Sequence, residues 1–330
     1  MHSSLIAWIL RAIPFGTIIM YGALGETVTE KSGNLNLGVP GIMYLGGFAG
    51  FASAWAYENT AANPSGAVSV VVALTCAILA SMAGGLIYAF LTISLRANQN
   101  VTGLALTTFG MGVANFFGVF ILNGASYSAA PIANKAFSAK IPVLSTLGDF
   151  GQVVFSYGFL VYAAIALAIA LHWFLTRTRA GLNLRAVGEN PATADAAGIN
   201  VTLYKYLATC IGAGICGIGG LYYVLDYNQG IWATTGQIEA LGWLAVALVI
   251  FTTWKPLNAI WGAYLFGMLY WLYQFLPTLL GITMASHITD LVQMLPYVVT
   301  IVVLIVVSMR KKKENQPPAH LGLAYFREER

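Results

Sequence analysis

Polar side chains that interrupt long apolar stretches are the residues of this sequence best suited to recognising a small polar molecule. They lie in residues 26–41, in the apolar segment 101–122 and in residues 226–239. Their amides and hydroxyls can hydrogen-bond a solute, and non-helical backbone at membrane depth is tolerated only where it is buried in protein or lines a wet cavity. We therefore expect a polar path through the protein, lined by Asn34, Asn36, Thr107, Thr108, Asn115, Asn228, Gln229 and Trp232.

Several of these residues also have a purely structural alternative. Asn34 and Asn36 could belong to an ordinary loop with capping asparagines, and the hydroxyls of Thr107 and Thr108 could bond back to their own helix. Trp232 could stack on a planar ring or pack against other side chains. The sequence alone leaves both readings open.

Motifs for catalysis are absent from the sequence. It contains no GxxxxGK[ST] loop for nucleotide phosphates, no HExxH and no GxSxG with a matching base. Cys76, Cys210 and Cys216 lie in apolar segments without a CxxC or Cys/His cluster, so they are predicted to be packing residues. We expect no enzyme activity, no metal site and no bound cofactor in this chain.

Composition places the chain in a membrane. Of its 330 residues 58% are hydrophobic and 8% are charged, with a mean hydropathy of +0.74, whereas about a quarter of residues are charged in soluble proteins. We predict an all-α polytopic membrane domain over residues 1–310, followed by a solvated cytoplasmic tail, 311–330. About nine transmembrane helices (8–10) are expected, with broken or re-entrant segments at the two interruptions: Leu5–Leu24, a span after Gly41, Val68–Leu95, Val101–Leu122, Phe155–Leu175, Leu203–Leu225, Ala240–Trp254, Asn258–Leu280 and Leu291–Ser308.

The distribution of charge predicts how these spans are oriented. Arg96, Lys255 and the basic run at 310–313 all fall on one side, which the positive-inside rule makes cytoplasmic. The N-terminus is then outside and the C-terminus inside, with 123–152 as an outer loop. The first apolar segment resembles a secretory signal, but it leads straight into further spans, so we expect a retained helix. The net charge of +4 reflects these flanks and gives no support for nucleic-acid binding.

Small residues recur every four positions in three of the expected spans. Such spacing places them on one helix face, where neighbouring backbones can approach closely. The two interruptions also follow spans of opposite direction, a pattern typical of an inverted repeat. The residues predicted to lie at close helix contacts are Gly46, Gly50, Gly110, Gly118, Gly212 and Gly220.

The longest strongly polar run between two apolar segments is 176–205. Within it Asn190 is a good N-cap, Pro191 suits the first helical position, and Gly198 can end the helix in the left-handed conformation. The run 192–197 favours helix, but at about 1.5 Å per residue it is far too short to cross a bilayer. We expect one short helix beside the membrane.

Two blocks resemble a known family. GLNLRAVGENPATADAAGIN, from Gly181 to Asn200, resembles the cytoplasmic coupling segment of permease subunits of ABC importers, in the branch for branched-chain amino acids, ribose-type sugars and nucleosides. GETVTEKSGNLNLGVPGIMYLGGFAG, from Gly25 to Gly50, is most similar to its nucleoside permeases, which are linked to basic membrane proteins. The resemblance covers residues 16–308 and implies a membrane subunit importing nucleosides or related ribose compounds.

The resemblance also implies partners and contact residues. A separate ATPase subunit would bind ATP and grip residues 177–202, the coupling segment. A second permease, expected to be a paralogue, would complete the path in the plasma (inner) membrane, and an extracytoplasmic lipoprotein would deliver the solute. The residues implied in ATPase coupling are Arg185, Gly188, Glu189, Asn190, Pro191, Ala194, Asp195 and Gly198.

Two other function classes compete with this reading. A stand-alone secondary transporter or facilitator would need a titratable coupling site in mid-membrane, and the acidic residues lie mostly at loops and boundaries. A membrane-embedded enzyme would need a paired nucleophile and base or a metal cluster. The sequence contains neither feature.

Overall fold

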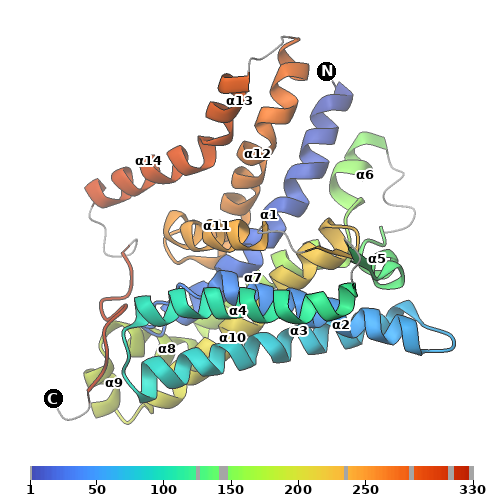
Figure 1. Ribbon diagram of the computed structural model, residues 1–330. Coiled ribbons are helices and arrows are strands. Elements are labelled where there is room, and N and C mark those ends of the chain that lie inside the picture. Colours follow the sequence, from blue (N-terminus) through green and yellow to red (C-terminus); the bar gives the residue numbers. More distant parts are fainter. Residues whose placement is uncertain are drawn as a thin grey trace.

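The computed structural model describes residues 2–123, 127–140, 148–233, 237–281, 286–310 and 316–326 (Figure 1). Over these residues the protein is almost entirely helical, which confirms the all-α prediction. Two short strands, β1 (Ser128–Ala129) and β2 (Ile231–Trp232), pair antiparallel, with Ser128 opposite Trp232. The helices are α1 (His2–Glu30), α2 (Val39–Thr60), α3 (Gly66–Ala89), α4 (Gln99–Leu122), α5 (Pro131–Phe137), α6 (Gly148–Phe155), α7 (Phe159–Arg177), α8 (Arg179–Glu189), α9 (Pro191–Ala196), α10 (Val201–Tyr222), α11 (Gln237–Phe251), α12 (Pro256–Leu280), α13 (Ser286–Gln293) and α14 (Leu295–Arg310).

Five helical segments within the described residues are long and apolar enough to cross a membrane: Ser4–Glu30, Gly66–Ser94, Gln99–Ile121, Phe159–Arg177 and Val201–Tyr227. The apolar helix α11 is shorter. The polytopic architecture is thus confirmed, while the number nine and the inverted repeat stay predictions. Two of these segments end in π-helical turns, η1 (Phe90–Ser94) and η3 (Tyr223–Tyr227).

Helices α1, α2 and α10 form the centre of the core. Helix α1 packs along α10 and α12, and α10 packs along α2 and α3. Glycines allow the backbones of these helices to approach closely. A Cβ added at Gly46 of α2, for example, would lie 2.5 Å from the Cα of Gly217 of α10. An added Cβ would also come within 3 Å of another residue at each of the other five predicted contact glycines. The pairs are Gly50 with Leu221, Gly110 with Gly41, Gly118 with Trp232, Gly212 with Gly25 and Gly220 with Met43.

The first interruption is shorter than the sequence indicated. Helix α1 continues through Glu26 to Glu30, and only residues 31–38 separate it from α2. Both carboxyl groups are buried and accept hydrogen bonds: Glu26 Oε1 from the backbone N–H of Asn36 at 2.9 Å, and Glu30 from the indole N–H of Trp254. Helix α1 therefore continues past both acids, with these two donors as partners, although Glu26 Oε2 is buried with no hydrogen-bond partner among the described residues.

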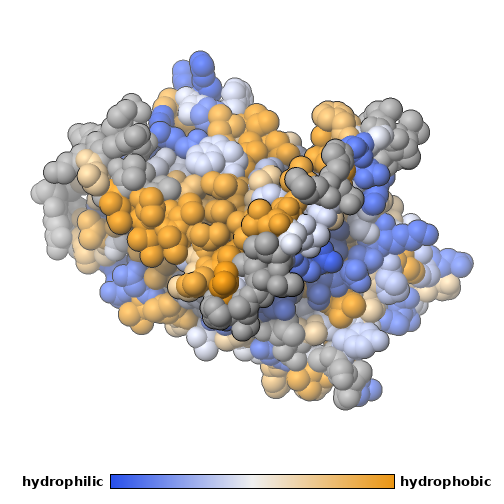
Figure 2. Space-filling view, turned by 90° about the horizontal axis from the view of Figure 1, so that it is seen from above, coloured by the Kyte–Doolittle hydropathy of each residue, from blue (hydrophilic) through white to orange (hydrophobic). Residues whose placement is uncertain are grey.

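Apolar side chains cover much of the outer surface. Figure 2 shows one face of the molecule on which hydrophobic residues gather in a broad area beside polar ones. On α4, Phe116 and Phe120 are 61% and 68% exposed, and Trp173 on α7 is 62% exposed. A surface of this kind is stable against lipid or another membrane protein.

Candidate coupling surface and aromatic cavity

The coupling segment folds into two helices, α8 and α9. As predicted, Asn190 caps α9: its Oδ1 accepts the N–H of Thr193 at 3.0 Å, and Gly198 ends the helix with φ +83°. Helix α8 was not foreseen from the sequence. Thr178 caps α8, because its hydroxyl oxygen accepts the N–H of Gly181 at 3.0 Å. The sequence did contain a signal for this helix, namely the helical spacing of the residues on its buried face: Gly181, Leu184, Val187 and Gly188.

The coupling segment contacts the end of α1 directly. A Cβ added at Gly188 would overlap the carbonyl group of Lys31, so the backbone of α8 lies against the turn after α1. Ala194 is buried in a small apolar cluster with Val187 and Val201, which ties α9 to α8 and α10. Movement of these short helices would therefore reach the long ones.

Residues 316–326, which we call the C-terminal segment, also pack on this surface. The N–H of His320 donates to the carbonyl of Gly188 at 3.0 Å, and that of Gly322 donates to the carbonyl of Gly33 at 3.1 Å. Two acids expected to contact the ATPase also bind this segment: Glu189 accepts the N–H of Ala319 at 3.3 Å, and Asp195 accepts the hydroxyl of Tyr325 at 2.9 Å.

Residues 316–326 of the expected tail thus pack on the coupling segment and the turn after α1, while the cytoplasmic location of this tail stays a prediction. The remainder of the expected tail, 311–315 and 327–330, lies outside the described residues. Docking has a physical reason, because Pro318 is buried and Leu321 packs against the main core. The run LGLAYF at 321–326 was the available signal, since it is far more apolar than its surroundings.

Positive charge gathers at this end of the protein. Lys31, Arg185 and Lys255 line a cavity of about 560 Å³ together with Glu189. Burial lowers the pKa of Lys31, and the Glu189 carboxylate partly opposes that shift. Burial also lowers the pKa of His320, and the positive charge of Lys205 lowers it further. The Nε of Arg185 is buried with no hydrogen-bond partner among the described residues.

Three of the predicted path residues pack together beneath the coupling surface. Asn34 donates to the Thr209 hydroxyl at 3.1 Å, and Asn36 Oδ1 accepts the N–H of Gly38 at 2.9 Å. Thr107 donates to the carbonyl of Leu37 at 3.0 Å. These bonds hold the 31–38 turn against α4 and α10.

An aromatic cavity lies toward the other end of α1. It consists of two adjoining cavities of about 860 and 570 Å³, which share Tyr227, Gln237 and Trp271. Asn228 and Gln229 line the larger one, so the structure places these two predicted residues far along α10 from Asn34. The aromatic side chains lining the smaller one are Phe15, Tyr223, Tyr227, Tyr270, Trp271, Tyr273 and Tyr297.

Specific contacts order the rings around this cavity. Phe15 and Tyr270 stack with centroids 4.1 Å apart, and Tyr223 donates its hydroxyl to Gln237 at 2.5 Å. The guanidinium of Arg11 lies 5.1 Å from the Trp271 ring. Sequence reasoning missed this cluster, although the run YWLY at 270–273 is dense in aromatic residues.

The remaining predicted path residues lie apart from both cavities. The Thr108 hydroxyl bonds back to the carbonyl of Leu104 at 3.4 Å, and Asn115 Oδ1 is buried with no partner among the described residues. Trp232 is buried and packs edge-on against Phe48 at 5.2 Å. The described residues contain no group of three His, Cys, Asp or Glu that could hold a metal ion.

Comparison with known proteins gives consistent matches over nearly the whole chain. Residues 8–306 match the family described as branched-chain amino acid transport system, permease component. The chain is 35% identical over 272 residues to the "Putative glucose ABC transporter permease protein TsgC13" of Haloferax volcanii, covering 81% of this chain and 77% of the relative.

Two further relatives are named for nucleosides. Identity is 30% over 292 residues with the nucleoside ABC transporter permease protein NupC of Lactococcus lactis subsp. cremoris, covering 88% of both chains. With the guanosine ABC transporter permease protein NupQ of Bacillus subtilis it is 33% over 253 residues, covering 74% of this chain and 75% of the relative.

Proposed function

The chain belongs to the permease-component family of branched-chain amino acid transport systems, and on this premise we propose that it forms half of the substrate path of an ATP-driven importer for nucleosides or related ribose compounds. The observation that carries the substrate class is its identity of 30% and 33% to permeases named for nucleosides and guanosine. Its membership of an ABC permease family favours this reading over a stand-alone secondary transporter.

Energy enters from a separate ATPase subunit, because the sequence has no phosphate-binding loop of its own. That subunit binds the coupling segment, whose end of the protein carries Lys31, Arg96, Arg185, Lys205 and Lys255. This excess of cations supports a cytoplasmic location for that end, with the N-terminus on the outer side. A lipoprotein delivers the solute there, and a second, paralogous permease completes the path.

Helix α1 transmits the movement in this proposal. The turn that follows α1, at Lys31, touches Gly188 of α8, and Phe15 in the N-terminal half of α1 lines the aromatic cavity. The distance from Phe15 to Glu30 along the helix is about 22 Å at 1.5 Å per residue. ATP-driven closure of the ATPase pushes α8 and α9, and a continuous α1 carries that displacement to the cavity.

The aromatic cavity suits a nucleoside better than a hexose. Each ring presents a π-face on which a planar base can stack, and such stacking contributes about 1–3 kcal/mol per base. Gln237, Gln293 and Asp290 also line the cavity and can hydrogen-bond base edges and ribose hydroxyls. A hexose has no planar face of that size. It could form the hydrogen bonds with these polar side chains, but it would lack most of the stacking energy from the rings.

Crosslinking and uptake test this proposal together. After replacement of the native cysteines by alanine, Thr193→Cys and Ala196→Cys, both exposed on the coupling segment, should crosslink to the co-expressed ATPase subunit. Lys135→Cys in the outer loop is the matched control and should stay uncrosslinked. Guanosine uptake into vesicles should require both ATP and the ATPase. Crosslinks from residue 135 alone, or gradient-driven guanosine uptake by this chain without the ATPase, would refute the assignment.

A further inference from the structure

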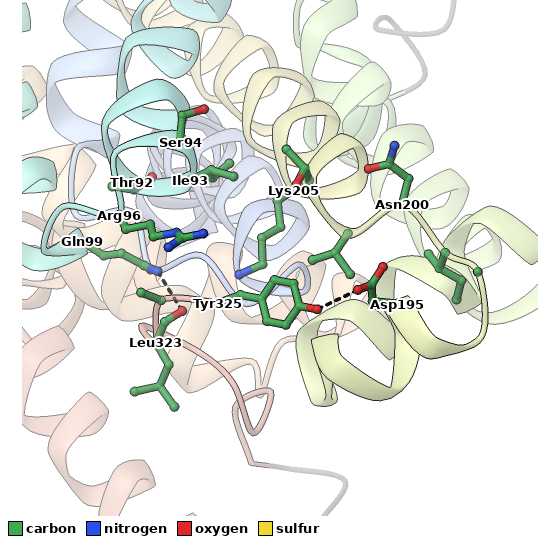
Figure 3. Close-up of a pocket in the computed structure, with 15 residues that line it drawn as sticks. Thr92, Ile93, Ser94, Arg96, Gln99, Asp195, Asn200, Lys205, Leu323 and Tyr325 are labelled. Carbon is green, nitrogen blue, oxygen red and sulfur yellow. Dashed lines mark hydrogen bonds between the residues drawn. The ribbon is translucent and has the colours of Figure 1, made fainter. Parts of the chain in front are cut away.

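A separate cavity of about 670 Å³ opens at the coupling end of the protein (Figure 3). One wall is formed by η1 and the start of α4, and the opposite wall by the connection from α9 to α10 and the first turn of α10. The C-terminal segment closes a third side through Leu323 and Tyr325. Three parts of the chain that lie far apart in sequence therefore meet around one space.

Lys205 is the buried cation of this cavity. The residue is 3% exposed, and its ammonium group points into the cavity in Figure 3. Among the described residues it has no hydrogen-bond or ion-pair partner. A buried, unpaired charge is strongly unfavourable, so a site of this kind is completed by an anion or remains a source of instability.

Other positive groups converge on the same space. Arg96 lines the cavity in a left-handed backbone conformation, φ +56°, and its guanidinium lies 4.6 Å from the ring of Phe326, which fixes its direction. Helices α4 and α10 both begin at the cavity, with Gln99 and Val201 in their first turns. The positive ends of two helices of more than twenty residues therefore reinforce the two cations.

Negative charge at the cavity is limited to one carboxylate on its described walls. Asp195 accepts the hydroxyl of Tyr325 at 2.9 Å, which orients that oxygen toward the C-terminal segment. Hydroxyl groups of Ser94 and Thr202 also line the space and can donate hydrogen bonds. Two cations, hydroxyls and helix N-termini form a donor set typical of phosphate sites.

We propose that this cavity binds the phosphate group of a small anion between Lys205, Arg96 and the first turn of α10. The source of that group is a soluble phosphate ester of the cytoplasm or the headgroup of an anionic lipid, which share this chemistry. The site does not depend on which solute the protein transports. A bound phosphate bridges α4, α10 and the C-terminal segment, so it stabilises the arrangement of the coupling segment seen here.

Thermal unfolding of the full-length chain in nanodiscs tests the site. In phosphatidylcholine nanodiscs, glycerol 3-phosphate should raise the Tm saturably and glycerol should not, because only the former carries phosphate and neither carries a base that could bind the aromatic cavity. In Lys205→Met the apparent affinity should fall about tenfold or more, as expected for a lost charge-assisted hydrogen bond. Lys135→Met, a lysine at the other end, should bind like the unaltered chain, and Lys205→Arg should retain most of the affinity.

A second measurement identifies the lipid source and guards against a folding defect. Without added phosphate, Lys205→Met should unfold at the same or a higher temperature than the unaltered chain, because it removes an unpaired buried charge. If phosphatidylglycerol nanodiscs alone give protection that depends on Lys205, the phosphate comes from a lipid headgroup. The proposal is overturned if neither phosphate source protects the chain, or if both protect Lys205→Met and the unaltered chain equally.

Discussion

The coupling end of the protein is held by hydrogen bonds between backbone segments, whereas the aromatic cavity is enclosed by packed rings. At the coupling end Gly188, Gly33 and Gln99 each bond the C-terminal segment. Around the cavity most ordering contacts involve rings, as in the stack of Phe15 on Tyr270 and the cation–π contact of Arg11 with Trp271, beside one hydrogen bond from Tyr223 to Gln237. Directional bonds fix position, and ring contacts allow several orientations.

This difference fits two tasks within one transport protein. A surface that receives a push must not deform, because a yielding element would absorb the displacement. A cavity that takes up and releases a solute must adjust its walls without a large cost at each step. The comparison predicts that changes at the coupling end abolish transport while leaving binding intact, and that changes in the cavity weaken binding while leaving coupling intact.

The largest effect is expected from Ala194→Pro. Proline removes the hydrogen bond from the Ala194 N–H to the Asn190 carbonyl, 3.0 Å long, and costs about 3 kcal/mol in a helix interior. That is enough to unfold a helix as short as α9. We expect ATP hydrolysis to continue while guanosine uptake in proteoliposomes stops. Ala192→Pro, in the first turn where proline is tolerated, is the control, and equal uptake by both variants would show that α9 transmits nothing.

The next effect concerns the packing of α4 against α2. A side chain at Gly110 would overlap the backbone of Gly41, whereas nothing lies within 4 Å of a Cβ at Gly112. Gly110→Leu should therefore cost about 1–3 kcal/mol or more, seen as a lower Tm and a smaller yield of folded protein. Gly112→Leu on the same helix should be almost neutral. Indistinguishable Tm values would mean that α2 and α4 are not in this contact.

A smaller, selective effect is expected in the cavity. Tyr270→Leu removes the ring stacked on Phe15, so half-saturation of guanosine uptake should rise about tenfold, within the 1–3 kcal/mol assigned to one stacked base. The ATP consumed per guanosine transported should stay unchanged. Trp173→Leu, on an exposed part of α7, serves as the control. A change in the ATP requirement without a change in half-saturation would reverse the roles of the two regions.

The smallest effect should come from Tyr325→Phe, which deletes one hydroxyl at the edge of the coupling surface. The loss of its bond to Asp195 should cost about 1 kcal/mol, because the site is only half-buried. Faster hydrogen exchange across residues 320–326 is the direct measurement. Asp195→Asn completes a double-mutant cycle, and strictly additive effects would mean that the two side chains do not interact.

Sequence reasoning succeeded where the determinants are local. Asn190, Pro191 and Gly198 act within one or two turns of chain, so the bounds of α9 followed from their types alone. Sequence reasoning failed where the interacting residues come from distant parts of the chain. Nothing next to Glu26 and Glu30 indicates that Asn36 and Trp254 will donate hydrogen bonds to them. Likewise, the aromatic cavity joins residues from α1 to α14 that no local pattern connects.

The docked C-terminal segment also bears on how the protein is made. Residues 316–326 leave the ribosome after every helix that they touch, yet they bond α8, the turn after α1 and the start of α4. This surface is therefore complete only when residues 316–326 have been synthesised, after α14. A partly synthesised chain would lack the segment that closes the surface, so in the proposed importer we expect the ATPase to bind only after all the described helices have been made.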